Sequence, residues 1–341
     1  MAAGRWWKGG IRNGALIGGL VVAAALLLNG TDIAATGAML RDLPTAIVMS
    51  TAVHIPQILL TALAWRALVP ANLRPSAATM SLLRWYRESA GMLLPVGGLV
   101  GQVAAARLLT RSGVPGHLAG ATATVDLTVE VVSQVFFTLA GLALLLSRGH
   151  AGGLEGVAAG GIAVVAGCAL AMVAVQRLPR LRWVAGRLAP FAWRWPALRL
   201  HRLEPLYQAV LSLHAQPGTL ASALCWHSAA WVLGALEIVG VLDLLGRPIS
   251  FADGLIIEST AQALRNAGFM LPGAVGVQEA AMISAAALVG VPPAGALTVA
   301  LVRRAREVLL SMAGLLAWQR SEATWRDNAV VAPSAVGREQ G

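Results

Sequence analysis

The sequence has little charge for its length. Charged residues make up 12% of the 341 positions, whereas hydrophobic residues make up 57%. A soluble domain carries about 25% charged residues, so this chain cannot cover a water-facing surface and is not an ordinary soluble protein. The mean hydropathy of +0.69 indicates instead a polytopic integral membrane protein whose solvent is lipid.

Lysine and cysteine are nearly absent. Lys8 is the single lysine among 26 basic residues, so the net charge of +10 comes mainly from arginine. The arginines flank apolar runs, as membrane orientation requires, and this placement argues against a nucleic-acid partner. Cys168 and Cys225 lie inside apolar runs without a paired or Cys/His pattern, so the sequence predicts neither a disulfide framework nor a metal site.

Signatures of catalysis and of cofactor binding are also missing. The sequence contains no HExxH, no Walker A loop, no GxSxG elbow and no dinucleotide-binding glycine pattern. We therefore expect no enzymatic activity and no cofactor, and an integral transferase is the weakest of the functions considered.

Long apolar runs predict an all-α protein with about six transmembrane helices. Each run is long enough to cross about 30 Å of hydrocarbon at 1.5 Å per residue. The first could instead be a signal peptide, but the many later runs favour a transmembrane helix. The predicted spans are 11–29, 45–66, 117–146, 154–176, 219–245 and 294–318.

Two further apolar segments, 89–113 and 255–290, are interrupted by proline and glycine. Proline removes a backbone donor and glycine loosens a helix, so such breaks survive at membrane depth only where protein or water satisfies the backbone. We predict two re-entrant segments, each made of two half-helices; two kinked full spans are the alternative. The predicted breaks are Pro95, Gly97, Gly98, Pro272, Gly273 and Gly276.

An internal repeat relates the two broken segments. Moving residues 88–141 forward by 177 positions requires no gap, and it aligns both Leu-Pro breaks, the two Gly-Val-Pro sequences and Glu130 with Glu307. The predicted topology places the copies, about 88–146 and 265–318, in opposite orientations. Inverted repeats with broken helices place a transporter's substrate site at their interface. A chance likeness between two apolar hairpins is the alternative.

The basic residues predict that both termini are cytoplasmic. With that orientation, 19 basic residues lie in cytoplasmic segments, and each of three external loops holds one. We expect one membrane domain, 1–320, followed by a disordered cytoplasmic tail, 321–341. The cytoplasmic loop 177–217 combines arginine with tryptophan, which suits the lipid headgroup layer; a solvated linker is the alternative.

Ionisable residues inside apolar segments are the candidate functional residues. Each costs about 2.5–3.5 kcal/mol to insert, so each requires a partner or a function. Two interpretations stay open: these groups pair and hold the bundle together, or they line a route for a lipid head group or an ion. We interpret His54 and His227 as satisfied core residues. The candidate pathway residues are Glu88, Asp126, Glu130, Glu237, Glu258, Arg265, Glu279, Arg303, Arg306 and Glu307.

Several short sequences together resemble the transmembrane region of lysylphosphatidylglycerol synthases, a flippase-like membrane family. The resemblance is closest to the hopanoid-biosynthesis-associated branch and covers residues 10–320. It departs from the family at Gln102, where a glutamate is usual. The sequences that carry it include Val125-Asp126-Leu127-Thr128-Val129-Glu130, Ile257-Glu258-Ser259, Pro272-Gly273-Ala274 and Gly276-Val277-Gln278-Glu279.

The resemblance implies a multi-pass protein of the bacterial inner membrane that handles lipids rather than catalysing a reaction. A hopanoid-type or other polar lipid is the expected cargo, and membrane lipids are the expected partners. The leading hypothesis is a lipid translocase. The alternative is a non-transporting accessory subunit that presents lipids to biosynthetic enzymes. The oligomeric state stays open.

Overall fold

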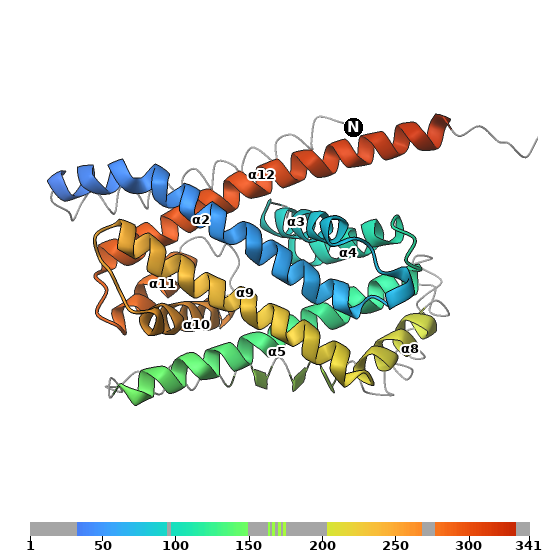
Figure 1. Ribbon diagram of the computed structural model, residues 1–341, viewed down its shortest axis with the longest axis horizontal. Coiled ribbons are helices and arrows are strands. Elements are labelled where there is room, and N and C mark those ends of the chain that lie inside the picture. The colour runs from blue at the N-terminus through green and yellow to red at the C-terminus, as the bar shows by residue number, and fades with distance from the viewer. Residues whose placement is uncertain are drawn as a thin grey trace, which may run out of the picture.

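The computed structural model describes residues 33–93, 97–148, 203–267 and 277–331, with a few helical positions between 163 and 174. Every element with defined bounds in these residues is a helix, which confirms the all-α prediction (Figure 1). The elements are α2 (Ile33–Leu68), η1 (Ala71–Leu73), α3 (Ala77–Leu93), α4 (Gly97–Thr110), α5 (Gly116–Ser147), α8 (Leu203–His214), α9 (Pro217–Leu244), α10 (Phe251–Ala267), α11 (Val277–Ala287) and α12 (Pro293–Val331).

Three of the described helices are long and apolar enough to cross a membrane. They are Asp42–Leu68 within α2, Gly116–Ser147 and Pro217–Leu244. Their positions agree with three of the six predicted spans. The predicted spans 11–29 and, for the most part, 154–176 lie outside the described residues. The number of six crossings therefore stays a prediction.

The two broken segments form helical hairpins. α3 and α4 pack against each other, and so do α10 and α11, which excludes two kinked but continuous spans. Gly97 and Gly98 begin α4, whereas Pro95, Pro272, Gly273 and Gly276 lie outside the described residues. The first hairpin begins at Ala77 rather than at residue 89, because its first helix carries buried arginines that an apolar-run criterion cannot detect.

The last predicted span is the first part of a longer helix. α12 carries several charges in its middle, which separates it from the three apolar spans. The predicted disorder from residue 321 is wrong as far as Val331, because α12 continues to that residue. Glu322 fixes this extension: it accepts hydrogen bonds from Arg111 at 2.7 Å and from Trp318 at 3.2 Å. Residues 332–341 lie outside the described part.

The end of the loop 177–217 forms the helix α8, which packs against α5. Ala209, Val210 and Leu213 recur at helical spacing and are buried in a core that also contains Val125 and Val129 of α5. Residues 177–202, with the tryptophans of this loop, lie outside the described residues. Its proposed contact with lipid head groups stays a prediction.

Residues 177 positions apart share their backbone conformation as well as their sequence pattern. Gly113 and Gly290 both adopt positive φ, 87° and 76°, just before α5 and α12. The amide of Gly113 donates to Thr110 O and that of Gly290 donates to Ala287 O, both at 3.1 Å. Only glycine adopts this conformation without strain, which explains its presence in both turns.

The correspondence extends further towards the N-terminus than the predicted start of the repeat. Val69 donates its amide to Arg66 O, and 177 residues later Gly246 donates to Asp243 O. These turns end α2 and α9, so the predicted repeat would comprise four helices in each copy: α2 to α5 in the first and α9 to α12 in the second.

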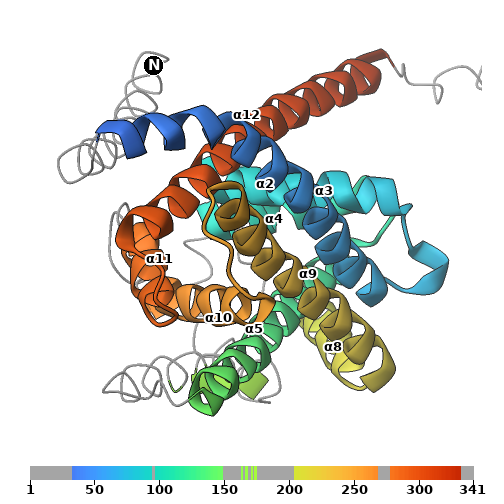
Figure 2. The same cartoon turned by 60° about the vertical axis from the view of Figure 1, so that its left-hand side comes forward.

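Two groups of four helices, α2 to α5 and α9 to α12, run in opposite directions and pack against each other. α2 and α9 pack against each other across the middle of the molecule (Figures 1 and 2). α5 lies on one side against α10, and α12 lies on the other side against α3. The colours in Figure 1 show that α5 and α12 run antiparallel, as do α2 and α9.

Glycine permits close approach at both of these interfaces. A Cβ on Gly141 of α5 would lie 1.8 Å from Oγ of Ser259 on α10. A Cβ on Gly314 of α12 would lie 2.0 Å from Oγ of Ser89 on α3. The long helices α5 and α12 are therefore packed closely against α10 and α3, each of which belongs to the hairpin of the other group.

Candidate functional site

A polar cavity of about 180 Å³ lies at the centre, where the two repeats meet. Its wall takes side chains from α2, α3, α5, α9, α10, α11 and α12. Eight of the ten candidate pathway residues line it, and the other two, Asp126 and Glu279, bind arginines of the same networks. The candidates on the wall are Glu88, Glu130, Glu237, Glu258, Arg265, Arg303, Arg306 and Glu307.

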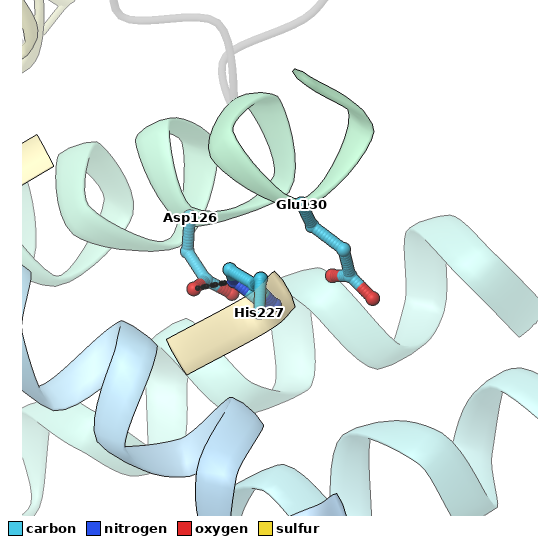
Figure 3. A group of neighbouring side chains, drawn as sticks. All are labelled: Asp126, Glu130 and His227. Carbon is cyan, nitrogen blue, oxygen red and sulfur yellow. Dashed lines mark hydrogen bonds and ion pairs between the residues drawn. The ribbon is translucent and has the colours of Figure 1, made fainter. Parts of the chain in front are cut away.

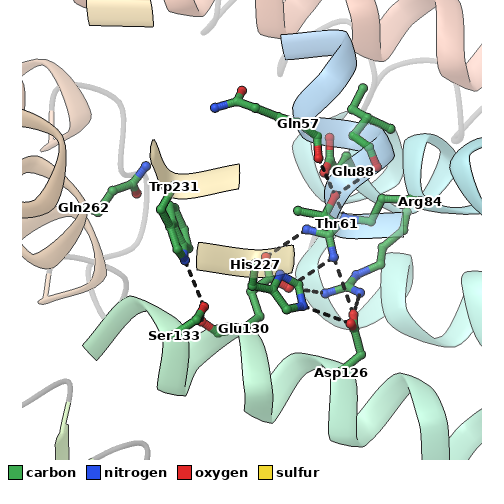
Figure 4. Close-up of polar contacts among 12 residues, drawn as sticks. Gln57, Thr61, Arg84, Glu88, Asp126, Glu130, Ser133, His227, Trp231 and Gln262 are labelled. Atoms are coloured by element: carbon green, nitrogen blue, oxygen red, sulfur yellow. Dashed lines mark hydrogen bonds and ion pairs between the residues drawn. The ribbon is translucent and has the colours of Figure 1, made fainter. Parts of the chain in front are cut away.

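The repeat-1 cluster joins two arginines of α3 to the acids of α5 (Figure 4). Arg84 donates to Glu130 at 2.8 Å and to Glu88 at 2.9 Å. Arg87 donates to Asp126 at 2.6 Å and to Glu130 at 2.8 Å. Arg84 also lies 3.5 Å from Asp126. Both guanidinium groups are buried, which Coulomb attraction to three carboxylates makes possible.

The 19 basic residues predicted to lie in cytoplasmic segments include four in residues 66–87, and this prediction is wrong for Arg84 and Arg87, which are buried in α3. The loop assignment relied on hydropathy, and their true neighbours are distant in sequence. The spacing of Arg84 and Glu88, four residues apart on one helix face, was the available signal. Gln102, which replaces the usual glutamate, also belongs here: with its amide oxygen facing Arg87, it accepts a hydrogen bond from Nη2 at 2.7 Å.

Two histidines join this cluster from the crossing helices α2 and α9. His227 is buried, and its Nε2 atom lies 3.0 Å from Oδ1 of Asp126 (Figure 3). His54 lies 3.5 Å from Glu88 and 2.6 Å from Gln57. Both line the cavity. They are hydrogen-bonded, as predicted for core residues, but their partners are polar network residues rather than an apolar core.

Asp126, Glu130 and His227 are close enough together to suggest a metal site. Their surroundings do not fit a cation. Arg84 and Arg87 lie within 3.5 Å of both carboxylates and already neutralise them. A metal ion would have to displace two buried guanidinium groups, so we assign no metal to these residues.

The repeat-2 cluster is centred on Glu237 of α9. Arg306 donates to both of its carboxylate oxygens at 3.0 Å, and Arg303 lies 3.2 Å away. Ser50 of α2 donates to it at 2.5 Å. Arg303 also donates to Glu258 at 2.6 Å. These contacts connect α2, α9, α10 and α12 within the buried interior.

Glu130 and Glu307 occupy equivalent positions of the repeats and both line the cavity, but they are bound differently. Glu130 is held by two arginines at 2.8 Å. The nearest cations to Glu307 are Arg306 at 3.7 Å and Arg304 at 3.8 Å, and Gln278 donates to it at 3.3 Å. Glu307 is therefore the more loosely held carboxylate of the pair.

Arg265 differs from the other arginines on the wall. Its guanidinium donates to the Gln262 side chain, whose amide in turn donates to Glu258 at 2.9 Å. Within the described residues, no ion pair includes Arg265. The arrangement as a whole presents charges of both signs to one partly open cavity, which suits recognition of a charged group.

Residues 14–314 match the family model of the lysylphosphatidylglycerol synthase TM region. No curated protein and no solved structure matches the chain significantly. The family and the apolar helices together indicate a membrane protein that takes part in a lipid-related process. Since the match covers most of its length, the chain belongs to the family of the lysylphosphatidylglycerol synthase TM region.

Proposed function

We propose that this protein is a lipid translocase of the bacterial inner membrane, which moves a head group through the central cavity while the acyl chains stay in the bilayer. The polar cavity between the repeats is the observation that carries this proposal. With a volume of about 180 Å³ and a wall of mostly charged and polar side chains, the cavity suits a polar head group rather than an acyl chain.

The distribution of charge supports a pathway over a purely structural network. Nine charged side chains of the described residues line the cavity. Ionisable groups at membrane depth are costly, and those that face a cavity are typical of substrate and ion routes. Charged side chains whose only role was to join helices would not need to lie on the wall of a cavity.

The antiparallel repeats supply a mechanism. α2 and α9 run in opposite directions, as do α5 and α12, which supports two copies inverted across the membrane with re-entrant hairpins. Rocking of one repeat against the other would open the cavity first to one leaflet and then to the other. No ATP-binding motif is present in the sequence, so the movement is passive or coupled to an ion gradient or a partner.

Both termini face the cytoplasm in this proposal. Once Arg84 and Arg87 are assigned to the repeat-1 cluster, 17 basic residues remain on the cytoplasmic side against three outside. This asymmetry still exceeds what the positive-inside rule requires. The protein is a transporter rather than an enzyme, and its partners are membrane lipids.

A hopanoid-type or other polar lipid is the proposed cargo, which the resemblance to the hopanoid-associated branch supports. The alternative function is an accessory subunit that presents such lipids to biosynthetic enzymes without moving them. The two functions differ in one measurable property, the rate at which lipid crosses the bilayer.

Purified protein in liposomes tests the proposal. Acyl-labelled phosphatidylethanolamine, phosphatidylglycerol and an amino-hopanoid are each incorporated, and quenching of the outer leaflet reports how fast the inner pool becomes accessible. We expect faster exchange of at least one lipid than in empty liposomes, and slower exchange with Glu307→Gln than with Arg148→Gln. Arg148 lies outside the cavity and binds Asp253. Rates equal to those of empty liposomes for all three lipids would contradict translocation and favour the accessory function.

A further inference from the structure

Two pairs of equivalent positions in the two repeats carry opposite charges. Glu88 and Arg265 are separated by the repeat offset of 177, and both line the cavity. Asp126 and Arg303, in the long helices, are related by the same offset. The site is therefore symmetric in its backbone and asymmetric in its charge, with an acidic end in the first repeat and a basic group facing it from the second.

The acidic end has more carboxylates than arginines. Arg84 and Arg87 are shared among Glu88, Asp126 and Glu130, which leaves one negative charge when the histidines are neutral. Glu88 is the most exposed of these acids, with 30% of its side chain accessible, against 21% for Glu130 and 0% for Asp126. A cationic group entering the cavity would find Glu88 the most accessible partner.

The opposite end offers hydrogen-bond donors for an oxyanion. Arg265 is held in place by Gln262 and, among the described residues, forms no ion pair with a carboxylate. Arg303 and Arg306 also line the cavity, but both already bind carboxylates, which leaves Arg265 as the guanidinium best placed for an oxyanion. A guanidinium fork matches a phosphate geometrically.

The charge balance favours a ligand with both signs. The wall carries four arginines and five glutamates, so it is close to neutral when the histidines are neutral. A ligand with one charge only would bring an uncompensated charge into a low-dielectric interior, whereas a zwitterion adds no net charge.

We propose that the cavity binds a zwitterionic head group in one orientation, with its phosphate at Arg265 and its amine at Glu88. The inference deepens the proposed function, on which its biological meaning rests, by naming the chemical class of the cargo. It concerns binding, however, and is measured without transport.

Four lipids with matched acyl chains measure the contributions of the phosphate and of the amine separately. Phosphatidylethanolamine carries a phosphate and an amine, phosphatidylglycerol only the phosphate, a diacyl trimethylammonium lipid only the cation, and diacylglycerol neither. Each competes with a fluorescent acyl-labelled phosphatidylethanolamine for the purified, full-length protein in detergent. We expect phosphatidylethanolamine to bind at least tenfold more tightly than the other three.

Variants of Arg265 and Glu88 then test which residue binds the phosphate and which binds the amine. Arg265→Gln should remove the advantage that a phosphate confers and leave affinity for the trimethylammonium lipid unchanged. Glu88→Gln should remove the advantage of the amine and leave affinity for phosphatidylglycerol unchanged. Arg265→Lys should keep part of the phosphate preference, and Arg148→Gln, which removes one arginine outside the cavity, should alter neither preference.

Several results would overturn the proposal. Wild-type protein that binds phosphatidylglycerol or the trimethylammonium lipid as tightly as phosphatidylethanolamine excludes a two-ended site. A variant with an unchanged melting temperature that weakens all charged lipids equally, or none, excludes the assignment of that end. Selective binding without accelerated lipid movement in liposomes would contradict the translocase proposal and leave this one intact.

Discussion

His227 of the second repeat binds Asp126 of the first, with Nε2 lying 3.0 Å from Oδ1 in the buried interior. The contact fastens α9 to α5 at the point where the acidic end of the cavity begins. Because Arg87 also holds Asp126, at 2.6 Å, the carboxylate links three helices. Its partners should therefore contribute measurably to stability.

We expect His227→Leu to lower the free energy of unfolding by about 1–3 kcal/mol, because it removes a hydrogen bond and leaves a buried carboxylate oxygen without its partner. His227→Gln keeps a side-chain donor and should lose less. Thermal unfolding in detergent measures both variants. Equal melting temperatures for the two would show that the hydrogen bond to Asp126 contributes nothing.

Glu130 and Glu307 should respond differently to neutralisation. Glu130→Gln weakens the hydrogen bonds that two buried arginines make at 2.8 Å, while Glu88 and Asp126 still balance their charge, so we expect destabilisation of about 1–3 kcal/mol. Glu307→Gln breaks only contacts of 3.7 Å and longer and should leave the melting temperature within a few degrees while slowing lipid movement. Thermal unfolding and liposome exchange on the same preparations check this. Normal exchange with Glu307→Gln would rule out its assigned pathway role.

The contact between α5 and α10 depends on the absence of a side chain at Gly141. Gly141→Ala would place Cβ 1.8 Å from Oγ of Ser259 and 2.7 Å from its Cβ, so we expect a loss of about 1–3 kcal/mol from overpacking. Ser259→Gly in the same chain removes both clashing atoms and should restore most of the loss. Melting temperatures of the single and double variants measure the coupling, and the prediction fails when the second change gives no recovery.

The extension of α12 should depend on pH through Glu322. The hydrogen bond from Arg111 holds the pKa of this carboxyl below its usual range. A lowered pKa stabilises the folded extension above the unfolded pKa of about 4.3, and this stabilisation is lost as the pH falls through the folded value. At pH 7, Glu322→Gln should speed hydrogen exchange of residues 319–331. At a pH below the folded pKa of Glu322, the variant and the wild type should exchange alike in a parallel measurement.

The orientation of the chain can be tested by single cysteines in a background that lacks Cys168 and Cys225. We expect cysteines at Gly149 and Gly246 to react with an impermeant reagent from outside, and one at Ala197 only after the membrane is opened. The arginine asymmetry is the physical reason. Labelling of position 197 from outside in intact cells would reverse the topology.

Hydropathy predicted those helices that are apolar along their length. The predicted spans 117–146 and 219–245 differ from α5 and α9 by at most two residues at either end, because a long apolar run is enough to predict a helix of this kind. Proline and glycine mark the hairpins in the sequence, and the offset of 177 residues aligns them with each other. Each of these signals is local in sequence, or repeated at a constant distance.

The networks could be predicted only in part, because ion pairs connect residues that are far apart in the chain. Arg84 resembles a cytoplasmic arginine until Glu130, 46 residues later, is seen beside it. The sequence also could not predict that Glu130 and Glu307 are bound differently, because the repeat offset relates their positions but does not show which residues contact them. The continuation of α12 depends on Arg111, more than 200 residues away.

Neither half of the molecule is self-contained, because α5 packs against α10 and α12 packs against α3. A single four-helix unit would keep the contact of its long helix with its own hairpin, α5 with α4 or α12 with α11, and would lose the contact with the hairpin of the other unit. Two polypeptides divided between α5 and α9 should still assemble when co-expressed, because the interfaces between the units need no covalent link.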